Sequence, residues 1–204
     1  MSVLSKTDIL KHFKQGNIII DPFNPRNLAN TSYDVRLGKF YYRQHPMDII
    51  QTLNPFYEKS VRKMYPQLEE AELVSKHISE RNPFYNLSPK DLIILIAPGE
   101  TILAHTIEFI GGKNGILNKL AAVTSEMRAR SSLGRIGIAV CKCAGWGDIG
   151  YVNRWTMEIT NFSNVIIPLP VGLRVAQIIF HAVTPVDQPD EYFQKGKYQM
   201  ENDV

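Results

Sequence analysis

A run of short apolar segments, separated by turns rich in proline and glycine, fills the second half of the chain and most constrains its fold. The segments that we expect to be strands are residues 92–96, 101–107, 155–161, 165–169 and 175–183. Short apolar segments bounded by turn residues are typical of strands, whereas helices of globular domains are longer. Many such strands at close spacing predict a mainly β fold, a jelly roll or a related barrel.

Residues 1–45 predict one helix and further strands. Leu4 and Ser5 precede the helix as a hydrophobic staple and an N-cap, and Gly16 ends it. Residues 18–20 predict a short buried strand. Residues 31–38 alternate as a half-buried strand that ends in a turn at the last residue, Gly38, and another strand is expected from Phe40.

Residues 45–90 have a weaker pattern because prolines divide them into short pieces. We expect helices over residues 58–64 and 67–80, the second with a solvated acidic face at Glu69, Glu70 and Glu72. The region is interpreted as a small helical and loop elaboration within a single domain of residues 1–204. Residues 184–204 predict a C-terminal tail that becomes ordered by docking.

The composition is that of a soluble globule, with 44% hydrophobic and 21% charged residues. The formal net charge of +3 arises from scattered basic residues, so we expect no nucleic-acid partner. No signal peptide or apolar segment of membrane length is visible, which predicts a cytoplasmic protein with no membrane partner.

Zinc chemistry is not expected. Cys141 and Cys143 are the only cysteines, and the pattern of a zinc-dependent base deaminase, a His or Cys followed by Glu together with Pro-Cys-x-x-Cys, is missing from the sequence. Neither a disulfide between these cysteines nor a shared metal is predicted. The five histidines are scattered over different segments and are interpreted as structural or exposed.

The stretch 128–158 carries the chemistry that the sequence predicts. It opens with a polar turn at 130–135, continues as an alternating strand from Ile136 to Cys141, and reverses at a glycine cluster around Asp148. It closes on Glu158, an acid within an aromatic and apolar strand. The reversal brings the two ends back together, so an anion-binding turn is predicted near a carboxylate.

These residues resemble the dCTP deaminase branch of the dUTPase-like superfamily. The motifs that carry the resemblance are Arg130-Ser-Ser-Leu-Gly-Arg135, Ala144-Gly-Trp-Gly-Asp148, Ile149-Gly-Tyr151, Trp155-Thr-Met-Glu158, Ser32-Tyr-Asp-Val-Arg-Leu-Gly38, Pro170-Val-Gly-Leu-Arg-Val-Ala-Gln177 and Gly196-Lys-Tyr-Gln199. The resemblance implies a distorted jelly-roll or β-clip barrel that forms a homotrimer with active sites at subunit interfaces. It also implies a nucleoside triphosphate substrate that brings Mg2+ through its phosphates, with no metal ligand from protein side chains and no zinc.

The activity that the resemblance implies is hydrolysis of dCTP to dUTP and ammonia. The first alternative is a bifunctional enzyme that continues to dUMP and diphosphate, which Gly145 after Ala144 favours. A plain dUTP diphosphatase is a second alternative, disfavoured by Glu158. A non-catalytic nucleotide-binding regulator is a third, which Val152 and Asn153 keep open because that family has smaller residues there.

Three residues are the catalytic candidates. Deamination needs an activated water and proton delivery to the leaving amine, and one carboxylate that takes and then gives a proton can serve both steps. Glu158 is that candidate, with Ser131 holding the water and Arg135 stabilising the developing charge. The competing interpretation of Glu158 is a surface acid on an edge strand.

The remaining candidates contact substrate. The phosphate-binding set is Arg130, Ser132, Leu133 and Gly134. The resemblance implies that Gln177 and, in the tail, Tyr192, Lys197 and Tyr198 join it. The nucleoside-binding set is Ala144, Asp148, Tyr151, Thr156 and Met157. Asp148 would accept a hydrogen bond from the 3′-hydroxyl and Tyr151 would pack on the sugar, while Thr156 and Met157 would present backbone groups to the cytosine. Plainer interpretations are an Asx-turn at Asp148, an edge-strand polar residue at Gln177 and a disordered tail.

Overall fold

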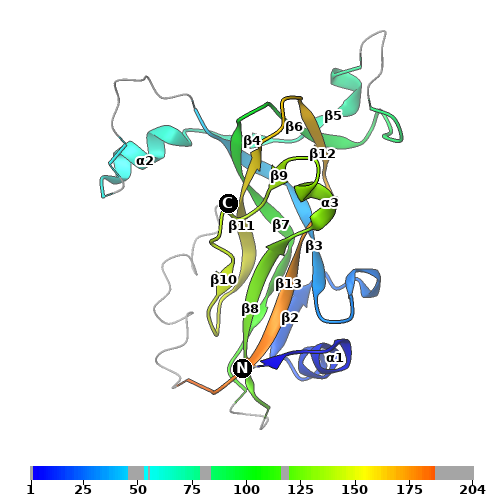
Figure 1. Cartoon of the computed structure of the whole chain (residues 1–204), viewed down its shortest axis with the longest axis vertical. Helices are drawn as coiled ribbons and strands as arrows, with labels where there is room; N and C mark the ends of the chain where they lie inside the picture. The colour runs from blue at the N-terminus through cyan, green and yellow to red at the C-terminus, as the bar shows by residue number, and fades with distance from the viewer. Residues whose placement is uncertain (1, 46–52, 55, 79–83, 116–119, 187–204) are drawn as a thin grey trace.

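The computed structural model describes residues 2–45, 53–54, 56–78, 84–115 and 120–186. Antiparallel strands are their main secondary structure, and they form a ten-stranded sheet and a smaller three-stranded sheet. Figure 1 shows the long strands running along the molecule, with helix α1 (Lys6–Lys14) at one end and the smaller sheet at the other. The prediction of a mainly β fold is confirmed. Among the described residues, no helix has the length and apolar character needed to cross a membrane.

The ten-stranded sheet curls into a half-barrel. Its path runs β10-β8-β13-β3-β7-β11-β9, and β1, β2 and β4 pair onto it at β13, β7 and β3. The end strands β9 and β10 are separated in sequence only by residues 140–145, so both ends of the path lie close together. The strands are β1 (Ser2–Val3), β2 (Ile18–Asp21), β3 (Tyr33–Arg43), β4 (Leu68–Glu70), β5 (Glu72–Leu73), β6 (Leu92–Ile96), β7 (Thr101–Gly112), β8 (Ala122–Ala129), β9 (Ile138–Ala139), β10 (Trp146–Gly147), β11 (Val152–Asn161), β12 (Ile167–Pro170) and β13 (Arg174–Val183).

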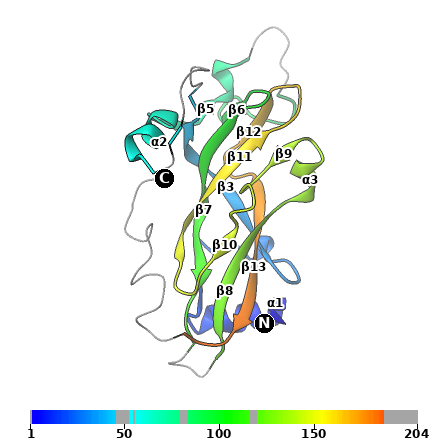
Figure 2. The same cartoon turned by 60° about the vertical axis from the view of Figure 1, so that its left-hand side comes forward.

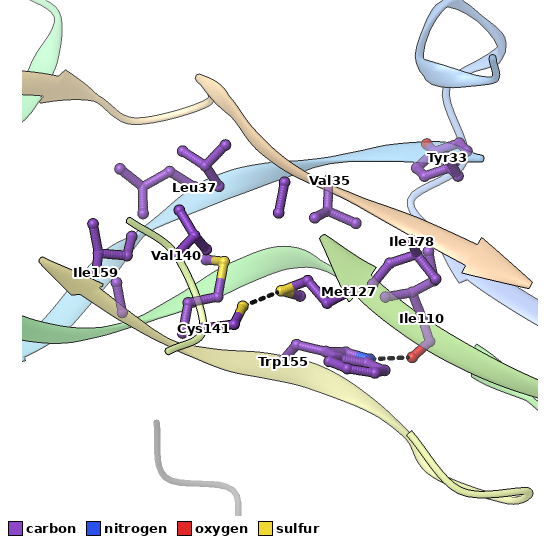
Figure 3. Packing of buried hydrophobic residues seen from close by; sticks show 14 of the residues in the cluster. Tyr33, Val35, Leu37, Ile110, Met127, Val140, Cys141, Trp155, Ile159 and Ile178 are labelled. Carbon is purple, nitrogen blue, oxygen red and sulfur yellow. Dashed lines mark hydrogen bonds between the residues drawn. The ribbon is translucent and has the colours of Figure 1, made fainter. Parts of the chain in front are cut away.

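The core fills the inside of this curl. On β11, Trp155, Met157 and Ile159 alternate inward and are buried. Figure 3 shows Trp155 donating from its indole nitrogen to the carbonyl of Ile110, at 2.9 Å. It also shows the thiol of Cys141 against the sulfur of Met127, at 2.8 Å. The inward face of β11 is therefore fixed by packing, and the residues between these positions face outward.

The N-terminal helix forms as its local sequence predicts. The Ser5 hydroxyl accepts from the Asp8 backbone N–H at 3.3 Å and donates to its carboxylate at 2.6 Å. Leu4 is buried before the helix, and Gly16 follows it with a φ of 76°. These contacts satisfy one free N–H group of the first turn, that of Asp8, and allow the chain to reverse after the last turn.

The region of residues 45–90 is only partly helical. Helix α2 (Glu58–Met64) confirms the first predicted helix. The predicted helix at 67–80 is wrong: within it lie strands β4 and β5 and the 3-10 turn η2 (Val74–Lys76). The physical reason is that β4 pairs with the free edge of β3, where Leu68 lies opposite Tyr42. That pairing outweighs a helical periodicity.

Other predicted strand boundaries are also wrong. Gly38 does not end a strand, because β3 continues through it to Arg43. Its lack of a side chain makes room for the imidazole of His105, which a Cβ at this position would approach to 2.1 Å. The predicted strand from Ile136 to Cys141 is reduced to β9, because Cys141, Lys142 and Cys143 adopt left-handed φ values of 70°, 31° and 73°. A left-handed backbone cannot continue a β-ladder.

Candidate active site

Strand β11 presents one carboxylate on its outward face. Glu158 lies between the inward residues Met157 and Ile159, opposite Leu103 of β7, and its side chain is half-buried. It is the only acid in the strand. Its carboxylate makes no hydrogen bond or ion pair with the part of the chain that the structure describes. A half-buried acid without a partner is available for proton transfer.

The backbone beside Glu158 is also available on one side. The Glu158 carbonyl accepts from the Cys141 N–H at 3.1 Å, so its backbone groups point away from β7. Because these directions alternate along an antiparallel strand, the N–H and C=O of Thr156 point the same way. On that edge β9 pairs only with Thr160 and Asn161. Met157 is adjacent to Glu158 in the strand, so its backbone N–H and C=O point to the other edge, toward Ala104 of β7. Its side chain is buried.

A left-handed turn at Cys141–Cys143 covers one end of this edge. It is held by the Ala144 N–H, which donates to the Cys141 carbonyl at 2.6 Å, and by the buried Cys141 thiol against Met127. Burial, together with the negative charge of Glu158, raises the pKa of the Cys141 thiol to about 12. This thiol is therefore protonated and structural, whereas Cys143 is exposed.

The elaboration contributes a further group near Glu158. Tyr65, directly after α2, has its pKa raised by burial and then by the negative charge of Glu158. The Met64 carbonyl accepts from the His45 N–H at 2.8 Å, which ties this segment to the end of β3. The sequence did not single out Tyr65, because only the pairing of β4 with β3 brings the segment there.

The polar turn at 130–135 forms a single helical turn, α3 (Ser131–Gly134), and confirms the turn that the sequence predicts. Leu133 is buried and anchors it, while Ser131, Ser132 and Arg135 are exposed. Figure 2 shows α3 and β9 near the same end of β11. Within the described residues of one chain, the Ser131 and Arg135 side chains make no hydrogen bond to Glu158. One chain therefore presents the two halves of the candidate site without joining them.

A second charged group lies where β3, β8 and β13 meet. The buried Asp34 carboxylate pairs with the guanidinium of Arg130 and, at 3.1 Å, with that of Arg174. Gln177 lies opposite Asp34 on β3 and opposite Arg128 on β8, and its carbonyl accepts from the Ser32 hydroxyl at 3.3 Å. Arg174 was not predicted as a site residue. Its signal was its place in the same motif as Gln177, three residues earlier.

The glycine-rich reversal forms the hairpin around β10. Asp148 is exposed, and its carbonyl accepts from the Tyr151 N–H at 3.0 Å. The half-buried Tyr151 ring packs edge-on against Trp155, with ring centroids 5.1 Å apart. Gly147 is required because a Cβ there would lie 2.5 Å from the Trp155 ring. Ala144 is exposed at the start of the hairpin. Tyr192, Lys197 and Tyr198 lie outside the described residues.

Known proteins resemble the chain along most of its length. A family model described as dCTP deaminase-like matches residues 3–183. A dCTP deaminase, dUMP-forming, of Methanosphaera stadtmanae is 30% identical over 191 residues, which cover 93% of this chain and 84% of that protein. A protein of the same description from Methanopyrus kandleri is 30% identical over 203 residues, covering 97% of this chain and 91% of the relative.

A solved structure shows the same fold. The crystal structure of 2′-deoxycytidine 5′-triphosphate deaminase from Agrobacterium tumefaciens matches with a TM-score of 0.57 at 16% identity, covering 89% of this chain. The match spans about half of that longer chain, 48%. At this identity the likeness concerns the fold: a curled antiparallel sheet with few helices.

Proposed function

Because the chain belongs to the dCTP deaminase-like family, we propose that it deaminates dCTP and carries the uracil product on to dUMP and diphosphate. The sequence favoured dUTP as the end product and held dUMP as the alternative. The relatives named dUMP-forming favour that alternative. Mg2+ enters with the substrate, bound through the triphosphate.

One observation carries the deaminase step: Glu158 is a half-buried carboxylate that has no hydrogen bond or ion pair among the described residues and lies beside an open backbone edge. An acid in this setting can take a proton from water and deliver it to the ring and the leaving amine. The Thr156 N–H and C=O on the same edge are a donor and an acceptor suited to the cytosine. Met157 would then act only by supporting this strand from the core, because its side chain is buried and its backbone is engaged with β7.

In the proposed mechanism, Glu158 takes a proton from a water held by Ser131. The water oxygen bonds to C4 of cytosine, the C4–N3 π electrons move to N3, and Glu158 then passes its proton to N3. Glu158 next takes the proton of the C4 hydroxyl and delivers it to the amine, so that the C4–N4 bond breaks, ammonia leaves and a C4 carbonyl remains. Arg135 stabilises the charge that develops during the addition.

We propose that Ser131 and Arg135 reach Glu158 from a neighbouring copy in a homotrimer. Exposed apolar residues beside α3 support this assembly: Ile136, Phe162, Val165 and Ile166, each at least half exposed. They are held together by the Phe162 N–H, which donates to the Gly137 carbonyl at 2.8 Å, and by the Asn161 amide, which donates to the Val165 carbonyl at 2.8 Å. Apolar side chains gathered at one end of a molecule are typical of an interface.

The triphosphate is assigned to Arg130 and Gln177, with Ser132 and the backbone of Leu133 and Gly134, and with Tyr192, Lys197 and Tyr198 closing over it. The Asp34 pairs support this assignment, because a buried carboxylate fixes the planar guanidinium of Arg130 in place before substrate binds. Arg174, on the same carboxylate, joins the set.

Asp148, on the exposed reversal, is proposed to hold the 3′-hydroxyl and to orient the water that cleaves the triphosphate in the second step. Tyr151 packs on the sugar, and Ala144 borders the base. The hairpin geometry around Gly147 supports these roles by keeping the Tyr151 and Trp155 rings in contact.

Product analysis tests the proposal. Incubating the protein with dCTP and Mg2+ and resolving the nucleotides by chromatography should give dUMP, diphosphate and ammonia. dUTP supplied alone should also give dUMP. Accumulation of dUTP would reject the second step, and unchanged dCTP would reject the deaminase itself.

Glu158→Gln should lower ammonia release by at least about 100-fold, because removal of a general acid–base costs about 10²–10⁴ in rate. Triphosphate binding, followed by calorimetry, should remain within about threefold, or less than about 1 kcal/mol. Ammonia release at the wild-type rate would remove Glu158 from this role.

A further inference from the structure

Lys142 lies on the same outward face of the sheet as Glu158. Its ammonium donates to the Thr101 hydroxyl at 3.0 Å, and that oxygen lies 2.8 Å from the Thr160 hydroxyl. Thr160 and Glu158 are two residues apart on β11, so their side chains share a face and their Cα atoms are about 7 Å apart. The ammonium therefore lies on the face that carries Glu158, at the level of Thr160, the next outward position along the strand.

The backbone that holds Lys142 there is unusual. Cys141, Lys142 and Cys143 all have left-handed φ values, which residues other than glycine rarely adopt. The turn persists because the Cys141 N–H is bound to the Glu158 carbonyl and its thiol is buried against Met127. Such conformations are typical of functional sites, where the surrounding structure maintains them. Here the constraint joins Cys141, the residue before Lys142, directly to the strand of the proposed base.

Lys142 places an ammonium group on the face of the sheet that carries Glu158. An ammonium has three N–H donors, and the Thr101 hydroxyl takes one of them, so two remain. The other titratable groups coupled to Glu158 are the Cys141 thiol and the Tyr65 phenol. Both have raised pKa values, so both are neutral near pH 7. Lys142 therefore brings a positive charge to this face.

We propose that Lys142 is a further catalytic residue, whose ammonium binds O2 of the pyrimidine and stabilises the adduct formed at C4. This inference rests on the proposed deaminase function. When the water oxygen bonds to C4, the electron pair that moves to N3 is conjugated with the C2 carbonyl, so O2 carries part of the negative charge. A cation at O2 therefore stabilises the adduct more than it stabilises cytosine. The proton transfers remain with Glu158.

Steady-state kinetics of Lys142→Met, Lys142→Gln and Lys142→Arg test the assignment, with ammonia release from dCTP as the readout. We expect Lys142→Met to lower kcat by about 10- to 100-fold, somewhat less than the loss of a buried oxyanion donor. Affinity for a non-hydrolysable α,β-imido analogue of dUTP should change by no more than about threefold, because the ground state carries little charge at O2. Lys142→Arg should recover most of kcat.

The matched control is Lys11→Met, which removes an exposed lysine from α1 and should leave kcat unchanged. A kcat of Lys142→Met within about twofold of wild type would overturn the assignment. A lowered kcat of Lys142→Met would also overturn the assignment if that variant has a lowered Tm and if Lys142→Arg does not restore kcat. If the methionine variant fails to fold, Lys142→Gln decides by the same criteria. Absence of ammonia release from the wild-type protein would instead reject the proposed function.

Discussion

At the scale of single residues, the two cysteines lie in one turn but differ in their exposure to solvent and therefore in their reactivity. The Cys141 thiol is buried against Met127, and burial with the nearby charge of Glu158 raises its pKa to about 12. Cys143 is exposed. Because the thiolate is the reactive form, the lack of solvent access and the raised pKa both protect the Cys141 thiol from modification.

Iodoacetamide at pH 8 should therefore alkylate Cys143 and spare Cys141. Intact-mass measurement of the native protein should show one adduct, and peptide mapping should place it on Cys143. Two adducts in the native protein would show that the turn opens. The variant Cys143→Ser should remain unmodified until denaturant is added.

Buried His105 makes stability depend on pH. Its Nδ1 lies 2.8 Å from the Thr106 carbonyl and its Nε2 accepts from the Phe40 N–H, and burial lowers its pKa. A pKa that is lower in the folded state means that the unfolded chain binds the proton more tightly. The stabilisation is complete above the unfolded value of about 6.5 and is lost as pH falls below it.

Urea unfolding between pH 7.5 and pH 5 should show this loss as a falling midpoint. His105→Gln should weaken the pH dependence relative to wild type, although it also costs stability at pH 7.5. His12, whose pKa burial also lowers, contributes to the same trend, so the double variant should be flatter still. A midpoint that does not fall between pH 7.5 and pH 5 would contradict the argument.

At the scale of elements, β3 continues through Gly38 because the His105 ring occupies the space where a side chain would project. Gly38→Ala should destabilise the protein by about 1–3 kcal/mol, since the ring or the strand must move. Gly134→Ala is the matched control, because no atom lies within 4 Å of its added Cβ. Chemical denaturation of both variants compares them, and equal midpoints would contradict the predicted clash.

Local interactions explain which elements could be predicted from sequence. The Ser5 cap and the α3 turn depend on neighbouring residues, and both form where expected. The prediction of a helix over residues 67–80 was wrong because β4, within this segment, pairs with β3, which is distant in sequence. Glu158 and the polar turn could be predicted as candidates because their signals lie in the local sequence. Lys142 and Tyr65 could not be, because their neighbours come from strand pairing and from a left-handed turn, whereas Arg174 shares a motif with Gln177 and could have been singled out.

At the scale of the whole molecule, the proposed site requires two copies, and complementation tests this directly. Glu158→Gln and Ser131→Ala/Arg135→Ala should each be nearly inactive alone. Mixing them after dissociation and reassociation should restore part of the activity, because mixed trimers contain some sites with both halves intact. Analytical ultracentrifugation should show a trimer. No gain in activity from mixtures shown to exchange subunits would place both halves of the site in one chain.

The pairing of β1 with β13 has a practical consequence for such experiments. Ser2 and Val3 lie beside Ala182 and His181, directly before the chain enters residues 184–186. An affinity tag fused before Met1 would therefore lie close to the end of β13. The C-terminal segment that is proposed to close over the triphosphate follows that strand. Kinetic work is best done with the tag removed, and a fluorophore attached at Val3, which is 52% exposed, would report on events at the opposite terminus.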